Sequence, residues 1–534
     1  MQGVQSLGRR ESADVVIIGA GHNGLVAAAY LATAGLEVVV LEARDVIGGN
    51  TVTEELTLSG YRHDACASAH VLIQSNPLIR DNELDLQQYG LTYVHTDPAM
   101  VMQLGDGSSL VMHRDIESTA AQLAERSPAD AETYRRMLAG WRAGLSRAHA
   151  RWNAGVPDPS RYEEDKRYAE LRARSAWDVV HELFADQGVR DFVLWLSFAT
   201  IRRPRLPGTG VLPYAITAGR TQFGWAIPLG GSDALPMALA RLVEDRGGAV
   251  YPGHPVERIL MRDGRAHGVA CAGGEIVTAR RAVVSSAHVT RLARMLEGGA
   301  PPPQVLDAQR RWRPGLTLFA VHLALRGPLR YPLPGGSGVQ EGGRPPRQLT
   351  SVDAVAGGLG SAAGLRDQIA EFDRGATYDA DPWLLVVCPN SVDPSRAPAG
   401  HATAKLLTIA PRQLANREWS TERERFARAL VRHAARRIDG LADTDVLDLR
   451  GECPEDLERR NPANVGGSCH GGEFLDDDGS VTVGLEDLRL LRGLYLTGST
   501  AHPGGSVSGR PGRNVARCVL SDLGIDPSRV MGED

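Results

Sequence analysis

The sequence predicts an α/β protein in which a parallel-sheet domain, discontinuous along the chain, carries an inserted α+β domain. Two stretches predict the first domain: a strand–glycine turn–helix–strand unit at residues 13–51 and a strand–glycine turn–helix unit at residues 493–523. Between them, strand and helix patterns alternate without an internal repeat. A chain of 534 residues is also too long for one simple core, so we expect two interleaved domains.

The first unit has the layout of a Rossmann-like nucleotide-binding motif. Residues 15–18 (VVII) form a short, β-branched apolar run typical of a buried parallel strand. The run breaks at residues 19–24 (GAGHNG) and passes into a helical pattern that ends near Gly35. A second apolar run, residues 38–41 (VVVL), stops at Glu42.

Each position of this motif has a physical role. Gly19 permits the tight turn, Gly21 lets backbone amides approach a pyrophosphate, and Gly24 lets the helix lie close to the strand. The helix N-terminus directs unpaired N–H groups and a partial positive charge at the phosphates. Glu42 can accept hydrogen bonds from an adenosine ribose, and an acid there disfavours the 2′-phosphate of NADP. A strand precedes the glycines, a helix follows them, and an acid ends the second strand. The whole unit is therefore a more specific sign of nucleotide binding than the glycine pattern alone.

A second glycine pair follows the ribose acid. Gly48 and Gly49 come six and seven residues after Glu42 and would let the backbone approach the cofactor again, toward a ribityl chain. A plain NAD domain does not usually need such a pair. FAD is therefore the predicted cofactor, and we expect it to be held without a covalent bond.

These residues resemble a known family. The run from Gly19 to Gly49 resembles the FAD-binding start of the phytoene desaturase-like flavoproteins, which include carotenoid desaturases and isomerases, retinol saturase and the phytoene dehydrogenase-related proteins. That group is related to the amine oxidases. Residues 52–55 (VTEE) and 60–61 (GY) also resemble the phytoene dehydrogenase-related branch.

Composition and targeting signals set broader limits. The chain is 43% hydrophobic and 23% charged with a net charge of −5, which is ordinary for a globular protein and gives no reason to expect nucleic acid as a partner. Its six cysteines form no CxxC pair and no zinc spacing, so we expect scattered thiols in a reducing cytoplasm and no metal. The leader has no hydrophobic segment and no stretch approaches 18 apolar residues.

Residues 96–225 read as the first, mainly helical part of the inserted domain. Ser127–Pro128 is a good helix start, residues 155–166 suggest a linker, and residues 177–196 suggest a helical patch rich in Trp, Leu and Phe. The cationic run 201–205 (IRRPR) could touch anionic lipid or an acidic substrate, although a solvated loop is the default. Peripheral contact with a membrane is thus one option for a cytoplasmic protein.

The chain then returns to the nucleotide-binding layer at residues 226–295. A helix at residues 234–245 and a strand at 249–251 precede a predicted hairpin around Asp263–Gly264 and a buried strand at 282–286. In the resembling family, the backbone near Val256 meets the adenine side of FAD.

Residues 296–464 read as the second part of the inserted domain. Residues 319–325 alternate like a half-buried strand, and residues 383–387 and 405–409 suggest strands of the same antiparallel sheet. Residues 328–347 are crowded with Gly and Pro and predict an exposed loop. An amphipathic helix is expected at residues 421–438.

The C-terminal unit is the second strong signal. A strand at residues 493–499 delivers the turn His502–Pro503–Gly504–Gly505 to a helix at residues 513–523. The resembling flavoproteins end with this turn against the ribityl chain and isoalloxazine. Two segments, residues 466–473 and 510–512, depart from the pattern of those relatives.

Two histidines are candidate catalytic residues, each with a structural alternative. His70 lies where the resembling proteins pass beside the flavin into the substrate region, but a hydrogen-bonded structural histidine is the favoured reading. His502 could position substrate or move a proton, because an unperturbed histidine pKa of about 6.5 suits that work. A brace within the turn is slightly favoured, because a hydrocarbon-like substrate offers no obvious proton partner.

Together, motif and resemblance give the predicted FAD site and domain division. The FAD-binding domain comprises residues 1–95, 226–295 and 465–534, and the substrate domain comprises residues 96–225 and 296–464. The predicted cofactor-binding residues are Gly19, Gly21, His22, Asn23, Gly24, Glu42, Ala43, Arg44, Gly48, Gly49, Asn50, Val256, Ser285, Gly498, Ser499, Gly504, Gly505, Ser506 and Val507.

The resemblance implies an FAD-dependent oxidoreductase that transfers hydride between a carbon centre of a hydrophobic small molecule and flavin N5. Dehydrogenation or saturation of a CH–CH bond is the first expectation. An amine or alcohol oxidase that uses oxygen is the second, and a flavin-binding protein without catalysis is the third. Oxygen and a quinone are both open as electron acceptors. Nothing in the sequence identifies the substrate, because fold does not fix function.

Overall fold

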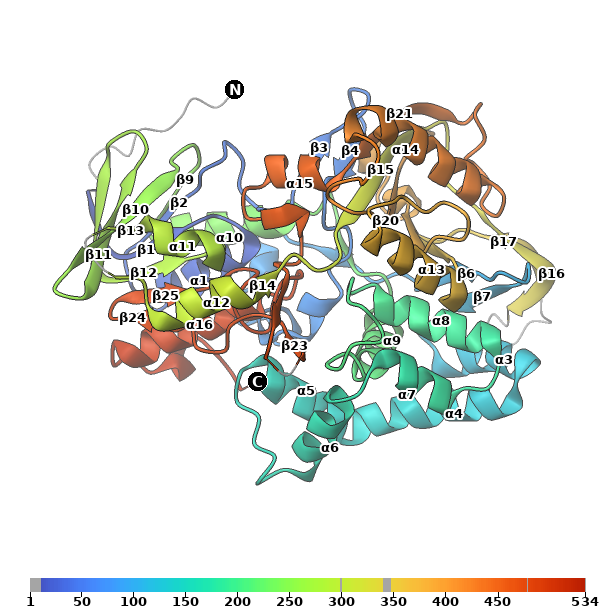
Figure 1. Cartoon of the computed structure of the whole chain (residues 1–534), viewed down its shortest axis with the longest axis horizontal. Coiled ribbons are helices and arrows are strands. Elements are labelled where there is room, and N and C mark those ends of the chain that lie inside the picture. Colours follow the sequence, from blue (N-terminus) through green and yellow to red (C-terminus); the bar gives the residue numbers. More distant parts are fainter. Residues whose placement is uncertain (1–10, 298–299, 340–346, 478, 534) are drawn as a thin grey trace.

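The computed structural model describes residues 11–297, 300–339, 347–477 and 479–533. Two large sheets lie on opposite sides of the molecule in Figure 1, with a layer of helices below the second. This arrangement confirms the predicted α/β class. None of the described helices is both long and apolar enough to cross a lipid bilayer.

The first sheet joins strands from three distant parts of the chain. Its parallel layer has the order β25-β12-β1-β2-β9, and the antiparallel strands β10 and β11 extend it beyond β12. The strands are β1 (Ser12–Ile18), β2 (Val38–Leu41), β9 (Ala249–Tyr251), β10 (Val256–Arg262), β11 (Arg265–Cys271), β12 (Ile276–Ser285), β13 (Leu296–Glu297), β24 (Arg489–Leu491) and β25 (Leu494–Leu496).

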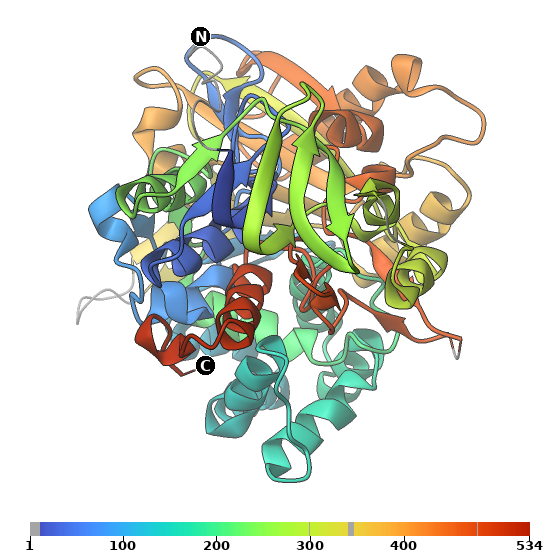
Figure 2. The ribbon, with the colours of Figure 1, turned by 90° about the vertical axis from the view of Figure 1, so that its left-hand side faces the viewer.

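Helices cover this sheet and bury its parallel strands. The C-terminal helix packs directly on the first helix, although the two are far apart in the sequence (Figure 2). All four residues of β2 are buried, as the continuous apolar run predicted. The helices around this sheet are α1 (His22–Thr33), α10 (Ala234–Asp245), α11 (Val289–Met295), α12 (Pro303–Arg311) and α16 (Arg510–Asp522).

The second sheet has the order β21-β15-β20-β19-β18-β6-β7 and is antiparallel except where β18 runs parallel to β6. It confirms that the predicted strands at 319–325, 383–387 and 405–409 share one sheet. Its strands are β6 (Met100–Gln103), β7 (Ser109–Met112), β15 (Leu318–Leu325), β18 (Ala356–Leu359), β19 (Leu384–Val387), β20 (Ala402–Ile409) and β21 (Val446–Glu452).

The prediction that residues 319–325 form a half-buried strand was wrong, because β15 is buried on both faces. On one face, α14 (Trp419–Ala435) covers it, and the rings of Phe319 and Phe426 have centroids 4.9 Å apart. On the other face, His322 meets His63 of the hairpin β3 (Thr53–Glu55) and β4 (Arg62–Asp64), with ring centroids 5.5 Å apart. The polar residue in the pattern thus belongs to a buried polar cluster.

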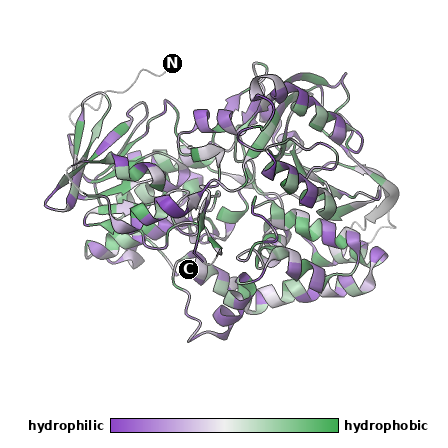
Figure 3. Cartoon of the chain, viewed as in Figure 1, coloured by the Kyte–Doolittle hydropathy of each residue, from purple (hydrophilic) through white to green (hydrophobic). Residues whose placement is uncertain are grey.

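The helical layer differs in one place from the prediction, because the expected linker at 155–166 contains the first residues of a helix. The predicted helical patch at 177–196 consists of two helices, and Asp186 caps the second by accepting from Val189 N. Figure 3 shows hydrophobic and hydrophilic residues alternating along these helices. The helices are α3 (Ile116–Arg126), α4 (Pro128–Gly140), α5 (Ser146–Asn153), α6 (Glu163–Arg172), α7 (Ala176–Leu183), α8 (Gln187–Phe198) and α9 (Leu212–Phe223).

The predicted exposed loop at 328–347 is also wrong in part, and residues 340–346 lie outside the described residues. Tyr331 and Leu333 are buried at the start of a strand that pairs with β17. The Tyr331 ring fills the space over Gly357, where an added Cβ would lie 2.1 Å from it. The remaining elements are β5 (Tyr93–Val94), β8 (Ile227–Pro228), β14 (Trp312–Arg313), β16 (Tyr331–Val339), β17 (Arg347–Val352), β22 (Glu473–Leu475), β23 (Val481–Thr482), α2 (Pro77–Arg80), α13 (Ala362–Asp373) and α15 (Pro454–Arg460).

The division into an FAD-binding domain (1–95, 226–295, 465–534) and a substrate domain stays a proposal. What supports it is the membership of the sheets: β1, β2, β9, β12 and β25 share the first, and β6, β15 and β20 share the second.

Candidate active site

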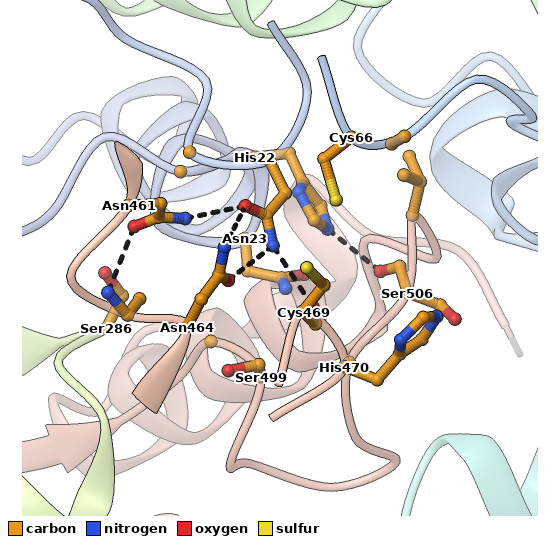
Figure 4. Close-up of a pocket in the computed structure, with 18 of the residues that line it drawn as sticks. His22, Asn23, Cys66, Ser286, Asn461, Asn464, Cys469, His470, Ser499 and Ser506 are labelled. Carbon is orange, nitrogen blue, oxygen red and sulfur yellow. Dashed lines mark hydrogen bonds between the residues drawn. The ribbon is translucent and has the colours of Figure 1, made fainter. Parts of the chain in front are cut away.

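A cavity of about 700 Å³ extends along the carboxyl ends of the parallel strands. The loop from β1 to α1, the end of β2, the end of β12 and the loop from β25 to α16 form one part of its wall (Figure 4). Ligands of α/β proteins bind at this edge of a parallel sheet. The far part of the wall comes from the residues just after α8, from α9 and from the second sheet.

The glycine loop has the geometry that a phosphate needs. Gly19 has a φ of +94°, and a Cβ on Gly24 would lie 2.2 Å from the carbonyl oxygen of Gly19. The backbones of Gly21 and Gly49 face each other, since a Cβ on Gly49 would come within 3.2 Å of Gly21 Cα. The N-terminus of α1 has no side-chain cap and no acid in its first turn. Its free N–H groups therefore point into the cavity ready for an anion.

Glu42 lies at the end of β2 and is held by backbone amides on both sides. Its Oε2 accepts from Ala20 N at 2.7 Å, and its Oε1 accepts from Arg44 N at 3.0 Å. Burial raises the pKa of this carboxyl above its usual value, although the two amides act against that shift. Each oxygen keeps acceptor capacity toward the cavity, which a ribose hydroxyl can use.

We expect Glu42→Ala to weaken FAD binding by about 1–3 kcal/mol, the cost of losing hydrogen bonds to a charged acceptor. Glu42→Gln, which keeps one acceptor oxygen, should lose less. The measurement is the dissociation constant of FAD for the cofactor-stripped protein. An affinity that does not change in Glu42→Ala would remove this carboxylate from the ribose site.

An amide cluster joins the two ends of the chain beside the second glycine pair. Asn50 donates to Asn464 Oδ1 at 2.8 Å and to Cys469 O at 3.1 Å, and its own oxygen accepts from Asn461 and Asn464 (Figure 4). The sequence reasoning missed Asn461 and Asn464, which come from a loop after α15 that carries no motif. His22 makes a second contact between the N-terminal unit and the C-terminal loop, because its Nε2 lies 3.0 Å from Ser506 O. Burial lowers the pKa of His22 to about 4, so it is neutral near pH 7.

Fifteen of the predicted cofactor-binding residues line this cavity, from Gly19 to Val507. They are Gly19, Gly21, His22, Asn23, Gly24, Glu42, Ala43, Gly49, Asn50, Val256, Gly498, Ser499, Gly505, Ser506 and Val507.

Four predicted residues lie elsewhere. Ser285 is fully buried and accepts from Ala287 N, and its neighbour Ser286 faces the cavity instead. Gly48 bridges to Gly21 through its backbone, and the Arg44 guanidinium donates to Gly49 O at 3.1 Å. Gly48 and Arg44 thus hold the two glycine segments in place without lining the cavity. Gly504 faces a second, smaller chamber.

His70 lines neither chamber. It is fully buried, with Nε2 2.7 Å from Ser232 Oγ and Nδ1 3.0 Å from Tyr93 Oη. Burial lowers its pKa to about 3. These contacts support the structural reading that the sequence favoured.

His502 also lines neither chamber. Its Nε2 donates to Trp152 O at 2.6 Å, and its ring meets the Trp152 ring edge-on at 4.6 Å. Burial lowers its pKa. This histidine thus ties the C-terminal turn to α5, as a brace would.

We therefore expect His502→Asn to lower the melting temperature or the FAD content, while flavin reduction per bound flavin stays within about 3-fold of the native rate. A proton-transfer role would instead cost about 10²–10⁴-fold in that rate. Stopped-flow reduction, normalised to bound FAD, separates the two. A variant with native stability, FAD content and rate would contradict both roles.

The far part of the cavity has an apolar wall with a few polar groups. Lys405 Nζ donates to Cys66 O at 2.5 Å and to Asp64 O at 3.3 Å, and burial lowers its pKa. Cys66 and Cys469 both line the cavity, and the hydrogen bond between them is the main cause that lowers the pKa of the Cys66 thiol. The apolar residues are Ala199, Ile216, Trp225, Leu318, Leu385 and Leu407.

Sequence reasoning missed Lys405, Cys66 and Cys469. One signal was available: Lys405 is one of only two lysines in a chain that otherwise uses arginine. The cysteines stand 403 positions apart, so nothing local pairs them.

The second chamber, of about 200 Å³, adjoins the first through Thr200, Ile216 and Gly219, which line both. Its other walls combine aromatic and cationic side chains, among them Trp152 and Arg202. The arginines of the cationic run at 201–205 contact other parts of this protein. Arg203 pairs with Asp373, and Arg205 stacks over Trp177 at 4.0 Å.

Comparison with known proteins agrees with this geometry. A model of the family described as flavin containing amine oxidoreductase matches residues 24–354. The chain is 26% identical to one of the subunits of limonene dehydrogenase from Castellaniella defragrans, over 96% of this chain and 95% of that one. It is 25% identical to the zeta-carotene-forming phytoene desaturase of Myxococcus xanthus, over 92% and 90%. The structure of putrescine oxidase bound to putrescine superposes with a TM-score of 0.60 at 15% identity, over 96% of this chain and 99% of that one.

Proposed function

The chain belongs to the flavin containing amine oxidoreductase family and is an FAD-dependent oxidoreductase, and from this premise we propose that it dehydrogenates a CH–CH bond of a hydrophobic small molecule. The reverse reaction, saturation, uses the same site. The observation that carries the proposal is the continuity of the cavity: the glycine loop and the apolar wall of the far part line one space.

The residues present fit FAD. The uncapped N-terminus of α1 would stabilise the pyrophosphate, and Glu42 would accept from the ribose. Gly498, Ser499, Ser506 and Val507 would lie along the rest of the cofactor. FAD, when bound, supplies the hydride acceptor at its N5 atom. The chain supplies position and dryness, since the apolar wall excludes water and strengthens every electrostatic interaction inside.

The names of two relatives support the CH–CH assignment. Limonene and phytoene are the compounds in the names of the dehydrogenase and the desaturase, and both are hydrocarbons. A cavity wall of Leu, Ile, Ala and Trp side chains suits such molecules. No partner for proton transfer is required from His70 or His502, in agreement with their places outside the cavity.

An amine or alcohol oxidase on the same fold is the second candidate. The fold of putrescine oxidase favours it, and Lys405 gives the far part of the cavity one polar group that could face a heteroatom. Such an enzyme would pass its electrons to oxygen. A flavin-binding protein without catalysis is the third candidate.

Anaerobic mixing of the FAD-loaded protein with three compound sets tests these candidates. The sets are terpenoid and fatty compounds with saturated carbon pairs (hydrocarbons and carboxylic acids), primary amines, and alcohols. We expect bleaching of the flavin only with members of the first set. Bleaching by amines or alcohols, with peroxide once air is admitted, would favour the second candidate. A flavin that dithionite reduces but no compound bleaches would favour the third.

A further inference from the structure

Three residues that line the far part of the cavity each carry a buried polar atom for which the described part of the chain supplies no hydrogen-bond partner. These atoms are Ser68 Oγ, Arg220 Nη1 and Trp225 Nε1, and all three residues line the same cavity. Buried polar atoms are paired in the great majority of cases, so each exception needs an explanation. Three such atoms on residues that line one cavity indicate a ligand that accepts hydrogen bonds.

These three residues come from two neighbouring segments of the chain. Arg220 lies in the last turn of α9, and its guanidinium stacks 3.8 Å above the Trp225 ring. Gly224 makes the turn between them with a φ of +61°, in contact with the backbone of Thr96. The segment that carries Ser68 runs beside Trp225, because His70 N donates to Ala226 O at 2.9 Å.

Arg220 carries a buried charge without a carboxylate partner among the described residues. Only 7% of it is exposed, and burial alone lowers its pKa to about 9, so it is a cation near pH 7. Arg396 and Arg513 are as deeply buried, and each pairs with a carboxylate at 2.6 Å, Asp64 and Glu83 respectively. An unpaired buried charge is costly, which makes Arg220 the exception that calls for an anion.

We propose that Ser68, Arg220 and Trp225 bind a carboxylate group of the substrate, which is then an apolar molecule that ends in a carboxylate. A guanidinium fork binds a carboxylate through two parallel N–H bonds, and an indole N–H and a hydroxyl can donate to its remaining lone pairs. This inference rests on the proposed function, since it places the reacting carbon pair of that molecule in the same cavity. The bound carboxylate orients the apolar part along the Leu and Ile wall.

The second chamber is the other cationic region, but its arginines have partners. Arg172 stacks over Trp152 at 3.9 Å, and Arg202 donates to Gly208 O at 3.4 Å. Glu473 also lines that chamber and offsets part of its charge. Arg220 also stacks on a ring, but among the described residues it has neither a carbonyl acceptor nor a nearby carboxylate, so it is the stronger anion site.

Calorimetric titration with decanoate, and with decanol as a neutral match of equal chain length, tests the proposal on both FAD-loaded and FAD-free protein. We expect the native protein to bind decanoate at least ~10-fold more tightly than decanol. Arg220→Gln should weaken decanoate binding by about 30-fold or more, as expected when one partner of a buried charged hydrogen bond is removed. Its decanol affinity and its FAD content should stay unchanged. Arg241→Gln, which changes an exposed arginine of α10, serves as the matched control and should alter nothing.

Trp225→Phe keeps the aromatic ring and removes only the indole donor. We expect it to weaken decanoate binding by about 10-fold while the melting temperature stays near that of the native protein. This variant tests the site even if Arg220→Gln does not fold.

Equal affinities for decanoate and decanol in the native protein would overturn the carboxylate site. So would an Arg220→Gln variant that loses FAD but binds decanoate normally, because the arginine would then serve the cofactor. Failure of the proposed function looks different: decanoate would bind through Arg220, yet no apolar carboxylate would bleach the flavin.

Discussion

A chain that ends after Arg492 is expected to retain no FAD, although its entire N-terminal glycine loop remains. The cut removes β25, which pairs with β12 in the centre of the sheet, and α16, which packs on α1. Val515, Ala516, Val519 and Leu520 of α16 are fully buried there. Burial of one large apolar side chain contributes about 1.5–3 kcal/mol, so losing this set approaches the whole stability of a typical domain.

The cut also removes the far side of the predicted FAD site. Gly498, Ser499, Ser506 and Val507 line the cavity opposite the glycine loop, and Ser506 O holds His22. The FAD content of the purified protein, read from its absorption spectrum after denaturation, is the measurement. A chain that ends after Gly524 keeps α16 and should keep FAD. Full FAD content in the shorter chain would refute the discontinuous domain.

Gly24→Val is expected to weaken FAD binding by more than roughly 100-fold, because overpacking of about 3 kcal/mol would fall directly on the phosphate loop. A Cβ at this position would lie 2.2 Å from Gly19 O, where neither atom belongs to a flexible side chain. The helix must then move away from the loop, and its N–H groups move with it.

Gly140→Val is the matched control for this change. Gly140 ends α4, and a Cβ there meets nothing within 4 Å. We expect its FAD affinity and melting temperature to stay close to native, since valine is a slightly better helix former than glycine. Equal losses in both variants would mean that valine in a helix, and not the approach to Gly19, causes the effect in Gly24→Val.

The first nucleotide-binding unit was predictable because its requirements are local. The turn requires Gly19, and the packing of the helix on the neighbouring strand requires Gly24. Both steric requirements arise from contacts within a stretch of six residues. Strand β2 and residues 15–18 of β1 were likewise evident, because a strand segment covered on both faces must be apolar. The C-terminal turn repeated the same local signals.

The far part of the site was not predictable, because its residues acquire a role only through what faces them. Lys405 meets Cys66 across 339 positions of sequence, and in the FAD part of the site the missed Asn464 meets Asn50 across 414. No period or turn signal marks such residues. For the same reason the buried faces of β15 were misjudged: His322 looked like a solvent-facing position and instead contacts His63.

The two candidate histidines show a related limit. Their residue type suited catalysis, but the polar atoms of His70 are taken by Ser232 and Tyr93, and His502 is tied to Trp152. Arg220 shows the opposite case. It drew no attention in a chain rich in arginine, and only its burial without a carboxylate distinguishes it.

The most direct test of the account is mass spectrometry of the product formed from a deuterated substrate. The compound that bleaches the flavin anaerobically is prepared with deuterium on two adjacent saturated carbons. The account predicts a product that has lost one deuterium from each of these carbons and gained a carbon–carbon double bond. Loss of deuterium from a single carbon next to nitrogen or oxygen, with a new carbonyl or imine, would contradict it.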